Sequence, residues 1–253
     1  QAHRKPGSSL ALEFPGTADL DIGDWTHAAL KERGIDVRAG TRVVSGDLSS
    51  KTLDTRDSKG KTSTITYEKL ILATGGSPAI PNLPGTSLQG VYTIQDMADA
   101  SRLGQVLSSV KSVAIVGAGF SGLEAAERLH NLSKTVHMIV RSRFMRRLLE
   151  EPMSEELASR IPHGIQIHKG QSPTSVNGEG QVSGLSLGET EIPVEAVILM
   201  TGIKPNVDLA RDLGIEIGTL GGVKVNERME TSVEDVYAVG DCVELQDPQT
   251  KAP

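Results

Sequence analysis

A short apolar segment that runs directly into a glycine-rich turn constrains the fold of this 253-residue chain more than any other feature. Residues 113–122 read Val-Ala-Ile-Val-Gly-Ala-Gly-Phe-Ser-Gly, a buried strand pattern that leads into the spacing Gly-x-Gly-x-x-Gly. A helix pattern follows at 121–132 and a second strand pattern at 135–140. This order predicts a βαβ unit whose turn binds a dinucleotide. The alternative is a glycine-rich turn without a ligand, which the flanking strands and helix disfavour.

The residue type at each position of the turn has a physical explanation. Gly117 permits the tight turn, Gly119 lets the backbone approach a pyrophosphate, and Gly122 lets the helix pack closely on the strand. Phe120 and Ser121 lie at the start of the predicted helix at 121–132, whose unpaired N–H groups attract the negative charge of a phosphate. We therefore assign these five residues to cofactor binding.

The second strand of the βαβ unit ends in basic residues. Turns that select NAD usually carry a carboxylate about 20 residues past the glycines, where it binds the ribose 2′-hydroxyl. This chain has Arg141 and Arg143 at that place, with Arg146 and Arg147 close behind. Because guanidinium groups suit a 2′-phosphate, the sequence favours NADP(H) over NAD(H). A solvated basic turn without a ligand is the alternative.

Two further apolar runs, at 69–73 and 194–200, lie before and after this unit, and both lead into Thr-Gly. The first is predicted to be a strand buried on both faces of a parallel sheet. Pro78, Pro81 and Pro84 come next and predict an extended segment between domains, because proline cannot donate a hydrogen bond to a helix or a central strand.

Shorter patterns complete the prediction. A helix is expected at 22–33, with Asp24 as its N-cap and Gly34 after its end. The other expected elements are an antiparallel meander with strands at 36–38, 41–47, 51–56 and 61–66, helices at 95–108 and 153–161, a strand at 165–168, a second meander within 172–192, and strands at 223–225 and 236–239.

Composition and charge exclude several classes of protein. Hydrophobic residues make up 38% of the chain and charged residues 23%, which fits a globular fold. The net charge of -6 provides no attraction to nucleic acid or to an anionic membrane, and no apolar run is long enough to span a bilayer. Cys242 is the single cysteine, which predicts a reducing, cytoplasmic compartment. The six histidines show no metal-binding spacing, so no metal site is expected.

The ordered motifs resemble those of the FAD-dependent pyridine nucleotide-disulfide oxidoreductase superfamily. Besides the glycine turn, they are Ala-Thr-Gly-Gly at 73–76, Thr-Gly-Ile-Lys-Pro-Asn at 201–206 and Val-Gly-Asp at 239–241. The resemblance covers about residues 19–247 and is strongest to the branch of NADH oxidases, rubredoxin reductases, nitrite reductases and CoA-disulfide reductases.

The resemblance implies an α/β fold with two domains of the same three-layer type. A Rossmann-like NAD(P)-binding domain at 95–205 would be inserted in a partial FAD-binding domain formed by 1–94 and 206–253. The implied function is that of an NAD(P)H-dependent flavoprotein oxidoreductase, in which a hydride passes from the nicotinamide to FAD and on to an unidentified acceptor. That acceptor would be a small molecule or a small redox protein, and a homodimer is expected for the full-length protein.

The resemblance also implies roles for individual residues. Thr74 and Gly75 would pass beneath the flavin, Asp241 would accept hydrogen bonds from the ribityl hydroxyls, and the backbone of Val43 would meet the adenine. Gly202 would contact the nicotinamide carboxamide. Glu124 would be the catalytic acid near flavin and nicotinamide, although interaction with the helix N-terminus also explains a carboxylate there.

The sequence departs from the family in two ways. It contains no second Gly-x-Gly-x-x-Gly for the FAD pyrophosphate and no redox-active cysteine early in the chain, since Cys242 matches a structural position. The chain is therefore expected to be truncated at both ends. The alternative function is that of a fragment that binds a nicotinamide dinucleotide, without flavin or catalytic activity of its own.

Overall fold

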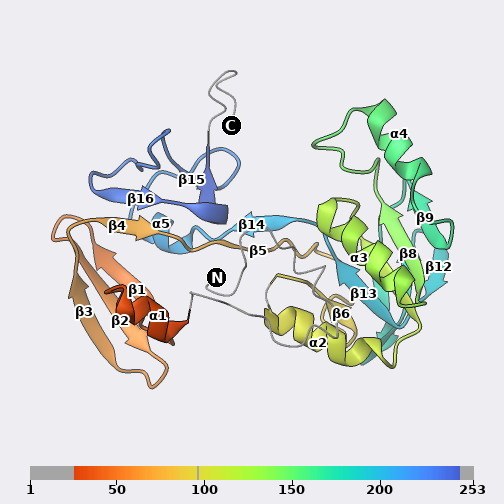
Figure 1. The fold of residues 1–253 in the computed structure, drawn as a ribbon, viewed down its shortest axis with the longest axis horizontal. Helices are drawn as coiled ribbons and strands as arrows, with labels where there is room; N and C mark the ends of the chain where they lie inside the picture. Colours follow the sequence, from red (N-terminus) through yellow and green to blue (C-terminus); the bar gives the residue numbers. More distant parts are fainter. Residues whose placement is uncertain (1–25, 96, 246–253) are drawn as a thin grey trace. The chain divides into compact units, whose positions relative to one another are not determined.

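The computed structural model describes residues 26–95 and 97–245, which form two compact units (Figure 1). Unit 1 contains the described residues from Pro78 to Gly202, and unit 2 contains the described residues up to Ser77 and from Ile203 onward. The chain therefore passes between the units twice, at 77/78 and at 202/203.

Unit 1 is built on a five-stranded parallel sheet with the strand order β6-β13-β7-β8-β9. Helix α3 connects β7 to β8, and helix α4 connects β8 to β9, so the predicted βαβ unit is confirmed. These elements are β6 (Val91–Tyr92), α2 (Met97–Leu107), β7 (Ser112–Val116), α3 (Phe120–Asn131), β8 (Thr135–Val140), α4 (Glu151–Ser159), β9 (Ile165–Lys169) and β13 (Ala196–Leu199).

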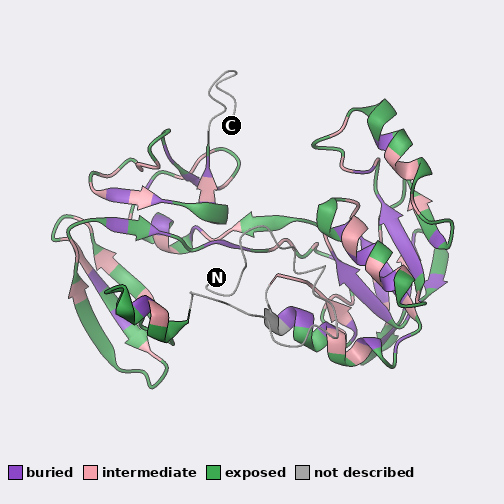
Figure 2. Ribbon diagram, viewed as in Figure 1, coloured by how far each residue is buried: buried purple, intermediate pink, exposed green. Residues whose placement is uncertain are grey.

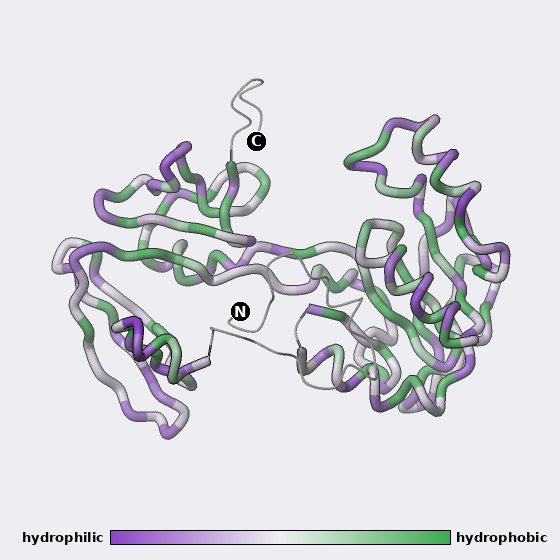
Figure 3. The backbone as a smooth tube through the Cα atoms, viewed as in Figure 1, coloured by the Kyte–Doolittle hydropathy of each residue, from purple (hydrophilic) through white to green (hydrophobic). Residues whose placement is uncertain are grey.

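The central strands of this sheet are buried on both faces, because alternate side chains point in opposite directions (Figure 2). Val113 and Ile115 of β7 pack with residues of the three helices. Ala114 and Val116 of the same strand belong to a second cluster on the opposite face. Hydrophobic residues accordingly gather along these strands, whereas the helices carry a mixed pattern (Figure 3).

The second cluster is covered by an antiparallel meander, as expected for residues 172–192. Its strands are β10 (Ser175–Glu179), β11 (Gln181–Leu187) and β12 (Thr190–Pro193), and they bury Val176, Leu185 and Ile192 against the sheet. Unit 1 thus has three layers: helices, parallel sheet and meander. Leu83 also belongs to this cluster, so the segment around Pro81 and Pro84 lies in unit 1.

Unit 2 combines an antiparallel meander with short strand pairs. The meander consists of β1 (Thr41–Asp47), β2 (Thr52–Asp57) and β3 (Thr62–Thr66), as predicted. The parallel pairs are β4 (Leu70–Leu72) with β16 (Val236–Ala238) and β15 (Val223–Lys224) with β17 (Val243–Glu244), while β5 (Gly76–Pro78) pairs with β14 (Ile203–Pro205). Its helices are α1 (His27–Glu32), α5 (Asp208–Asp212) and the 3₁₀ turn Gly240–Cys242.

Two sequence-based predictions for unit 2 are wrong. Residues 36–38 form no strand, because no described strand pairs with them; instead, Arg38 Nε lies 2.9 Å from Asp36 Oδ2. Strand β4 is not buried on both faces, since Ile71 is 61% exposed. Only the face that carries Leu70 and Leu72 packs against the core of unit 2.

The first helix also differs from its prediction. Thr26 is the N-cap of α1, and its Oγ1 accepts a hydrogen bond of 3.2 Å from the backbone N–H of Ala29. The predicted cap, Asp24, lies outside the described residues. Gly34 follows the helix end with φ +77°, in agreement with its predicted role.

Candidate functional site

The glycine turn of unit 1 contains positions that cannot hold a side chain. Gly117, directly after β7, has φ +123°, and a Cβ there would lie 2.2 Å from the carbonyl oxygen of Met200. A Cβ on Gly122 would lie 2.2 Å from the carbonyl oxygen of Gly117, so this glycine lets α3 pack on the turn. No atom lies within 4 Å of a Cβ built on Gly119. The open space beside Gly119 allows a ligand to approach the backbone.

Helix α3 begins at this open space. Gly119 is its N-cap, with an extended backbone and no side chain to bond the first turn. Phe120 and Ser121 are both exposed, Phe120 by 63%. The first N–H groups of a helix have no partners within the helix and carry partial positive charge. This end of α3 therefore offers hydrogen-bond donors to an anion such as a pyrophosphate.

The two predicted arginines after β8 have different surroundings. Arg141 is exposed, and its guanidinium forms no hydrogen bond or ion pair with any described residue. Arg143 is half-buried, and its Nη2 donates to the carbonyl oxygens of Arg146 at 3.1 Å and of Leu149 at 3.3 Å. Arg143 is thus held within its own loop, which leaves Arg141 the more accessible cation.

The arginine loop is joined to the glycine turn by the backbone. The N–H of Met145 donates a 2.8 Å hydrogen bond to the carbonyl oxygen of Ala118, and Met145 adopts φ +46°. The N–H of Gly117 donates to the carbonyl oxygen of Ile139 at 3.1 Å. These contacts hold the end of β8 beside the turn. No sequence signal singled out Met145.

Gly202 lies at the same edge of the sheet. It follows β13, which pairs in parallel with β7, and the N–H of Met200 donates to the carbonyl oxygen of Val116 at 2.8 Å. Gly202 is exposed and has φ +104°. The carboxyl ends of three neighbouring strands therefore bring together the glycine turn, Arg141 and Gly202, at the edge where open α/β sheets bind ligands.

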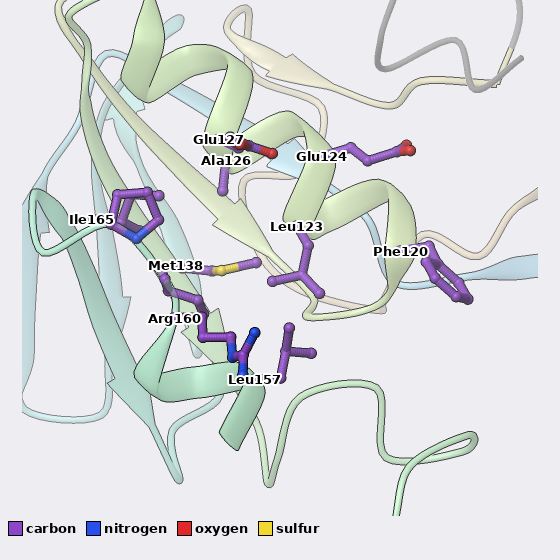
Figure 4. A pocket seen from close by; sticks show the side chains of 11 residues that line it. Phe120, Leu123, Glu124, Ala126, Glu127, Met138, Leu157, Arg160 and Ile165 are labelled. Carbon is purple, nitrogen blue, oxygen red and sulfur yellow. The ribbon is translucent and has the colours of Figure 1, made fainter. Parts of the chain in front are cut away.

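Glu124 lies at a separate place on α3. It is half-buried and lines a pocket of about 250 Å³ between α3 and α4 (Figure 4). Phe120 also lines this pocket, together with apolar side chains such as Met138 and Leu157. The glycines of the turn, Arg141 and Gly202 do not line it. The pocket therefore shares Phe120 with the predicted dinucleotide site but none of these other residues, and the catalytic role of Glu124 stays a prediction.

Unit 2 brings two of the predicted motifs together, Ala-Thr-Gly at 73–75 and Gly-Asp at 240–241. Strands β4 and β16 run parallel, with Leu72 opposite Ala238, so the segments that follow them lie at one edge. Gly75 follows β4 with φ +67°, and Gly240 follows β16 with φ +78°. Thr74 and Asp241, next to these glycines, are both exposed. The motifs Ala-Thr-Gly and Gly-Asp thus meet at the carboxyl ends of two neighbouring strands.

Cys242 directly follows Asp241 at this edge, whereas Val43 lies in the meander. Cys242 is fully buried, and its Sγ lies 3.3 Å from the carbonyl oxygen of Val239, which fits a structural position. Val43 lies in β1 of the meander, where its half-buried side chain packs against the core. The contact of its backbone with an adenine stays a prediction.

Comparison with known proteins agrees with this arrangement. The family model described as pyridine nucleotide-disulphide oxidoreductase matches residues 10–252. The chain belongs to this family. Members of the family that are similar in sequence include the NAD(P)H coenzyme A polysulfide/persulfide reductase of Pyrococcus horikoshii, 35% identical over 97% of this chain, and the NADH oxidase of Methanocaldococcus jannaschii, 32% identical over 86% of it. The chain covers only 55% and 49% of these relatives, about half their length.

Solved structures of the oxidoreductase family share the fold. An NAD-dependent persulfide reductase from A. fulgidus matches with a TM-score of 0.82 and 32% identity, over 86% of this chain and 41% of that one. A water-forming NADH oxidase from Lactobacillus brevis, bound to NADH, matches with a TM-score of 0.86 over 96% of this chain and 55% of that one. Its identity is 23%, so this second likeness concerns the fold alone.

The described residues show neither a membrane-spanning helix nor a metal-binding cluster. Among them, no helix has the length and hydropathy needed to cross a membrane. Within the same part of the chain, no group of three or more His, Cys, Asp or Glu residues is arranged to hold a metal ion.

Proposed function

We propose that this chain is part of an NAD(P)H-dependent flavoprotein oxidoreductase, with the nicotinamide nucleotide bound to unit 1 and FAD to unit 2. The observation that carries the proposal is that each unit presents a glycine-lined strand edge of its own. In unit 1 this edge is the turn at Gly117 and Gly119; in unit 2 it is formed by Gly75 and Gly240. The family membership of the chain supports the same assignment.

In unit 1, the nucleotide would be held mainly by the backbone. The open space at Gly119 admits the pyrophosphate, and the first turn of α3 supplies N–H donors to it. The exposed backbone at Gly202 would bond the carboxamide of the nicotinamide, while Phe120 offers an apolar surface beside the glycines. These contacts orient the nucleotide, which is the main contribution of the protein to such a transfer.

In unit 2, the residues at the strand edge fit a flavin. Gly240 is exposed and a Cβ built on it would meet no atom within 4 Å, so its backbone is open to a ligand, and the turn at Gly75 lies beside it. The Asp241 carboxylate is exposed beside them and can accept hydrogen bonds from sugar-type hydroxyls. When bound, the flavin accepts a hydride from the reduced nicotinamide and passes electrons to the final acceptor.

We propose NADPH as the preferred nucleotide. The fold does not decide this, because similar structures include one bound to NADH and an engineered water-forming NADPH oxidase bound to NADPH. The choice depends on the end of β8, where Arg141 is exposed and unpaired with any described residue, and no carboxylate occupies residues 141–143. A guanidinium there can pair with a 2′-phosphate.

The test is the colour of the flavin. The purified chain is mixed with FAD, freed of unbound flavin, and treated with NADPH or NADH without oxygen. Loss of the visible flavin absorbance on addition of NADPH supports the proposal. A chain that binds NADPH by calorimetry but retains no flavin would instead be a nucleotide-binding module, the second function that the single Gly-x-Gly-x-x-Gly in the chain allows.

We also propose that the final acceptor is a small molecule or a small redox protein and that the protein works in the cytoplasm. The buried free thiol of Cys242 is compatible with a reducing compartment. Reoxidation of the reduced flavin by oxygen, by a persulfide or by a redoxin, each measured separately, would identify the class of acceptor. Fractionation of cells that produce the protein would test its location.

A further inference from the structure

Two segments connect the units: the first connection, residues 75–79, and the second connection, residues 202–206. They are hydrogen-bonded to each other along their length. Strands β5 and β14 form a two-stranded sheet (Figure 1). Within unit 2, the N–H of Asn206 donates to the carbonyl oxygen of Gly75 at 2.9 Å; within unit 1, the N–H of Ala79 donates to the carbonyl oxygen of Gly202 at 2.9 Å. The residue numbers rise in one segment as they fall in the other, so the pair is antiparallel.

Asn206 makes four hydrogen bonds to the segment that follows β4. Its Nδ2 donates to the carbonyl oxygen of Thr74 at 3.0 Å, and its Oδ1 accepts from Ser77 Oγ at 2.7 Å. Its main chain adds the bond to Gly75 and accepts one from Thr74 Oγ1 at 2.6 Å. One residue of the second connection thus holds the whole turn from Thr74 to Ser77, although 132 positions separate Asn206 from Thr74.

The amide side chain suits this place because both of its functions are used. An aspartate could accept the bond from Ser77 but could not donate to the carbonyl of Thr74, and an apolar side chain could do neither. Pro205, directly before Asn206, fixes its own φ and so limits the conformations of the connection. Gly75, in the middle of the bonded turn, has φ +67°, a conformation that glycine adopts without strain.

We propose that Asn206 is a positioning residue that fixes the turn Thr74–Ser77 to the second connection. In part this rests on the proposed function, because Thr74 and Gly75 are the residues assigned to the flavin and Gly202, four residues before Asn206, is assigned to the nicotinamide. The side chain of Asn206 thereby ties the backbone beneath the flavin to the segment that leads away from the nicotinamide. Neither the flavin-facing turn nor the second connection can then rearrange without the other.

Hydrogen–deuterium exchange of the complete chain tests the clamp without any cofactor. Asn206→Ala is expected to speed amide exchange in both connections, 75–79 and 202–206, by roughly five-fold to a hundred-fold, as follows from the loss of two neutral hydrogen bonds. Ser77→Ala removes one of the two side-chain bonds and is expected to cause a smaller increase in the same segments. It also provides the test if Asn206→Ala fails to fold.

The matched control is Asn226, another asparagine of unit 2 with both amide functions in use. Its Oδ1 accepts from the N–H groups of Arg228 at 2.9 Å and Glu230 at 3.0 Å, and its Nδ2 donates to Glu230 Oε2 at 2.7 Å. These bonds are local, so Asn226→Ala should speed exchange only near residues 226–231. Unchanged exchange at 75–79 in Asn206→Ala, or an equal increase there in Asn226→Ala, would overturn the inference.

A second readout separates positioning from simple stability. In the flavin-loaded chain, Asn206→Ala should slow flavin reduction by NADPH about ten-fold at saturation, whereas the Kd for NADPH stays unchanged because no nucleotide contact is altered. A normal rate of reduction in this variant would overturn the positioning role. Failure of the proposed function is distinguishable, since it would show as absence of flavin reduction in the wild-type chain.

Discussion

The Nδ1 atom of His137 lies 3.2 Å from the Nε2 atom of His168, and the two imidazole rings stack with centroids 5.4 Å apart. His137 belongs to β8 and His168 to the neighbouring strand β9. In such a pair one ring donates and the other accepts, so at least one ring must be neutral. Burial, followed by the charge of His168, lowers the pKa of His137, and burial lowers the pKa of His168.

Unit 1 is therefore expected to lose stability in mild acid. Because both pKa values lie below the usual 6.5 in the folded state, the unfolded chain binds protons first as the pH falls. The contribution of the neutral histidine pair to the free energy of unfolding is complete above pH 6.5. It is lost as the pH falls from 6.5 through the lowered pKa values of the folded state. Urea unfolding at pH 5 to 8 should show this slope, and His168→Gln should flatten it. His163→Gln, at an exposed position, is the control and should leave the slope unchanged.

Two glycines of the turn should respond differently to alanine. Gly117→Ala places a Cβ against the carbonyl of Met200 at a positive φ, so we expect a loss of roughly 3 kcal/mol or more in the free energy of unfolding. Gly119→Ala meets open space and should cost at most about 1 kcal/mol, from the poorer N-cap.

Binding should separate the same two variants. The methyl group of Gly119→Ala occupies the space assigned to the pyrophosphate, so a nearly stable protein should bind NADPH at least ten-fold more weakly. Thermal melting and calorimetry on both variants check this. A Gly119→Ala chain with wild-type affinity would show that the open space at the turn is not the phosphate site.

The sequence predicts the parallel strands and the glycine turn well because their signals are local. The strands at 112–116 and 135–140 have the predicted bounds, and most residues within them are apolar and buried. Gly122 is a local case as well, since a Cβ there would meet the carbonyl of Gly117 in the same turn, whereas the close contact at Gly117 is with the distant Met200.

Features that depend on distant segments are not predicted from local patterns. The exposure of Ile71 depends on which strand pairs with β4, and that partner, β16, is more than 160 residues away. Likewise, the bonds of Arg143 to the carbonyls of Arg146 and Leu149 depend on the shape of a loop that no periodicity describes. The motif that contains Asn206 is visible in the sequence, but its role is apparent only from its bonds to Thr74 and Ser77.

Unit 2 has an ion cluster, formed by Asp235 and two lysines, whose removal should lower the melting temperature. Asp235 lies 2.6 Å from both Lys51 Nζ and Lys69 Nζ, and the hydrogen bonds from these lysines lower its pKa to about 2. The ionised Asp235 carboxylate therefore stabilises the folded state above pH 3.8, and this stabilisation is lost as the pH falls toward 2. Asp235→Asn keeps the shape and tolerates φ +59°, so its melting temperature should fall at neutral pH and the deficit should shrink in 1 M salt. Asp36→Asn, in an exposed pair with Arg38, is the control and should have little effect.

The choice of nucleotide should depend on Arg141 far more than on Arg143. Arg141 is exposed and free of partners among the described residues, whereas Arg143 is held by the carbonyls of its own loop. A charge-assisted hydrogen bond to a 2′-phosphate is worth about 1.5 to 3 kcal/mol, so Arg141→Glu should weaken NADPH binding roughly ten-fold to a hundred-fold and leave or improve NADH binding. Arg143→Ala should mainly lower the stability of the loop.

Titration calorimetry of NADPH and NADH, at low and high salt, checks the predicted role of Arg141. The wild-type preference for NADPH should shrink as salt screens the phosphate. Lys59→Glu, which makes the same change of charge at an exposed turn of unit 2, is the matched control and should bind both nucleotides as the wild type does. If Arg141→Glu and Lys59→Glu behave alike, the arginine is a solvated surface residue. A selective loss of NADPH affinity in Arg141→Glu alone would mean that the guanidinium contacts the phosphate, because overall charge is equal in the two variants.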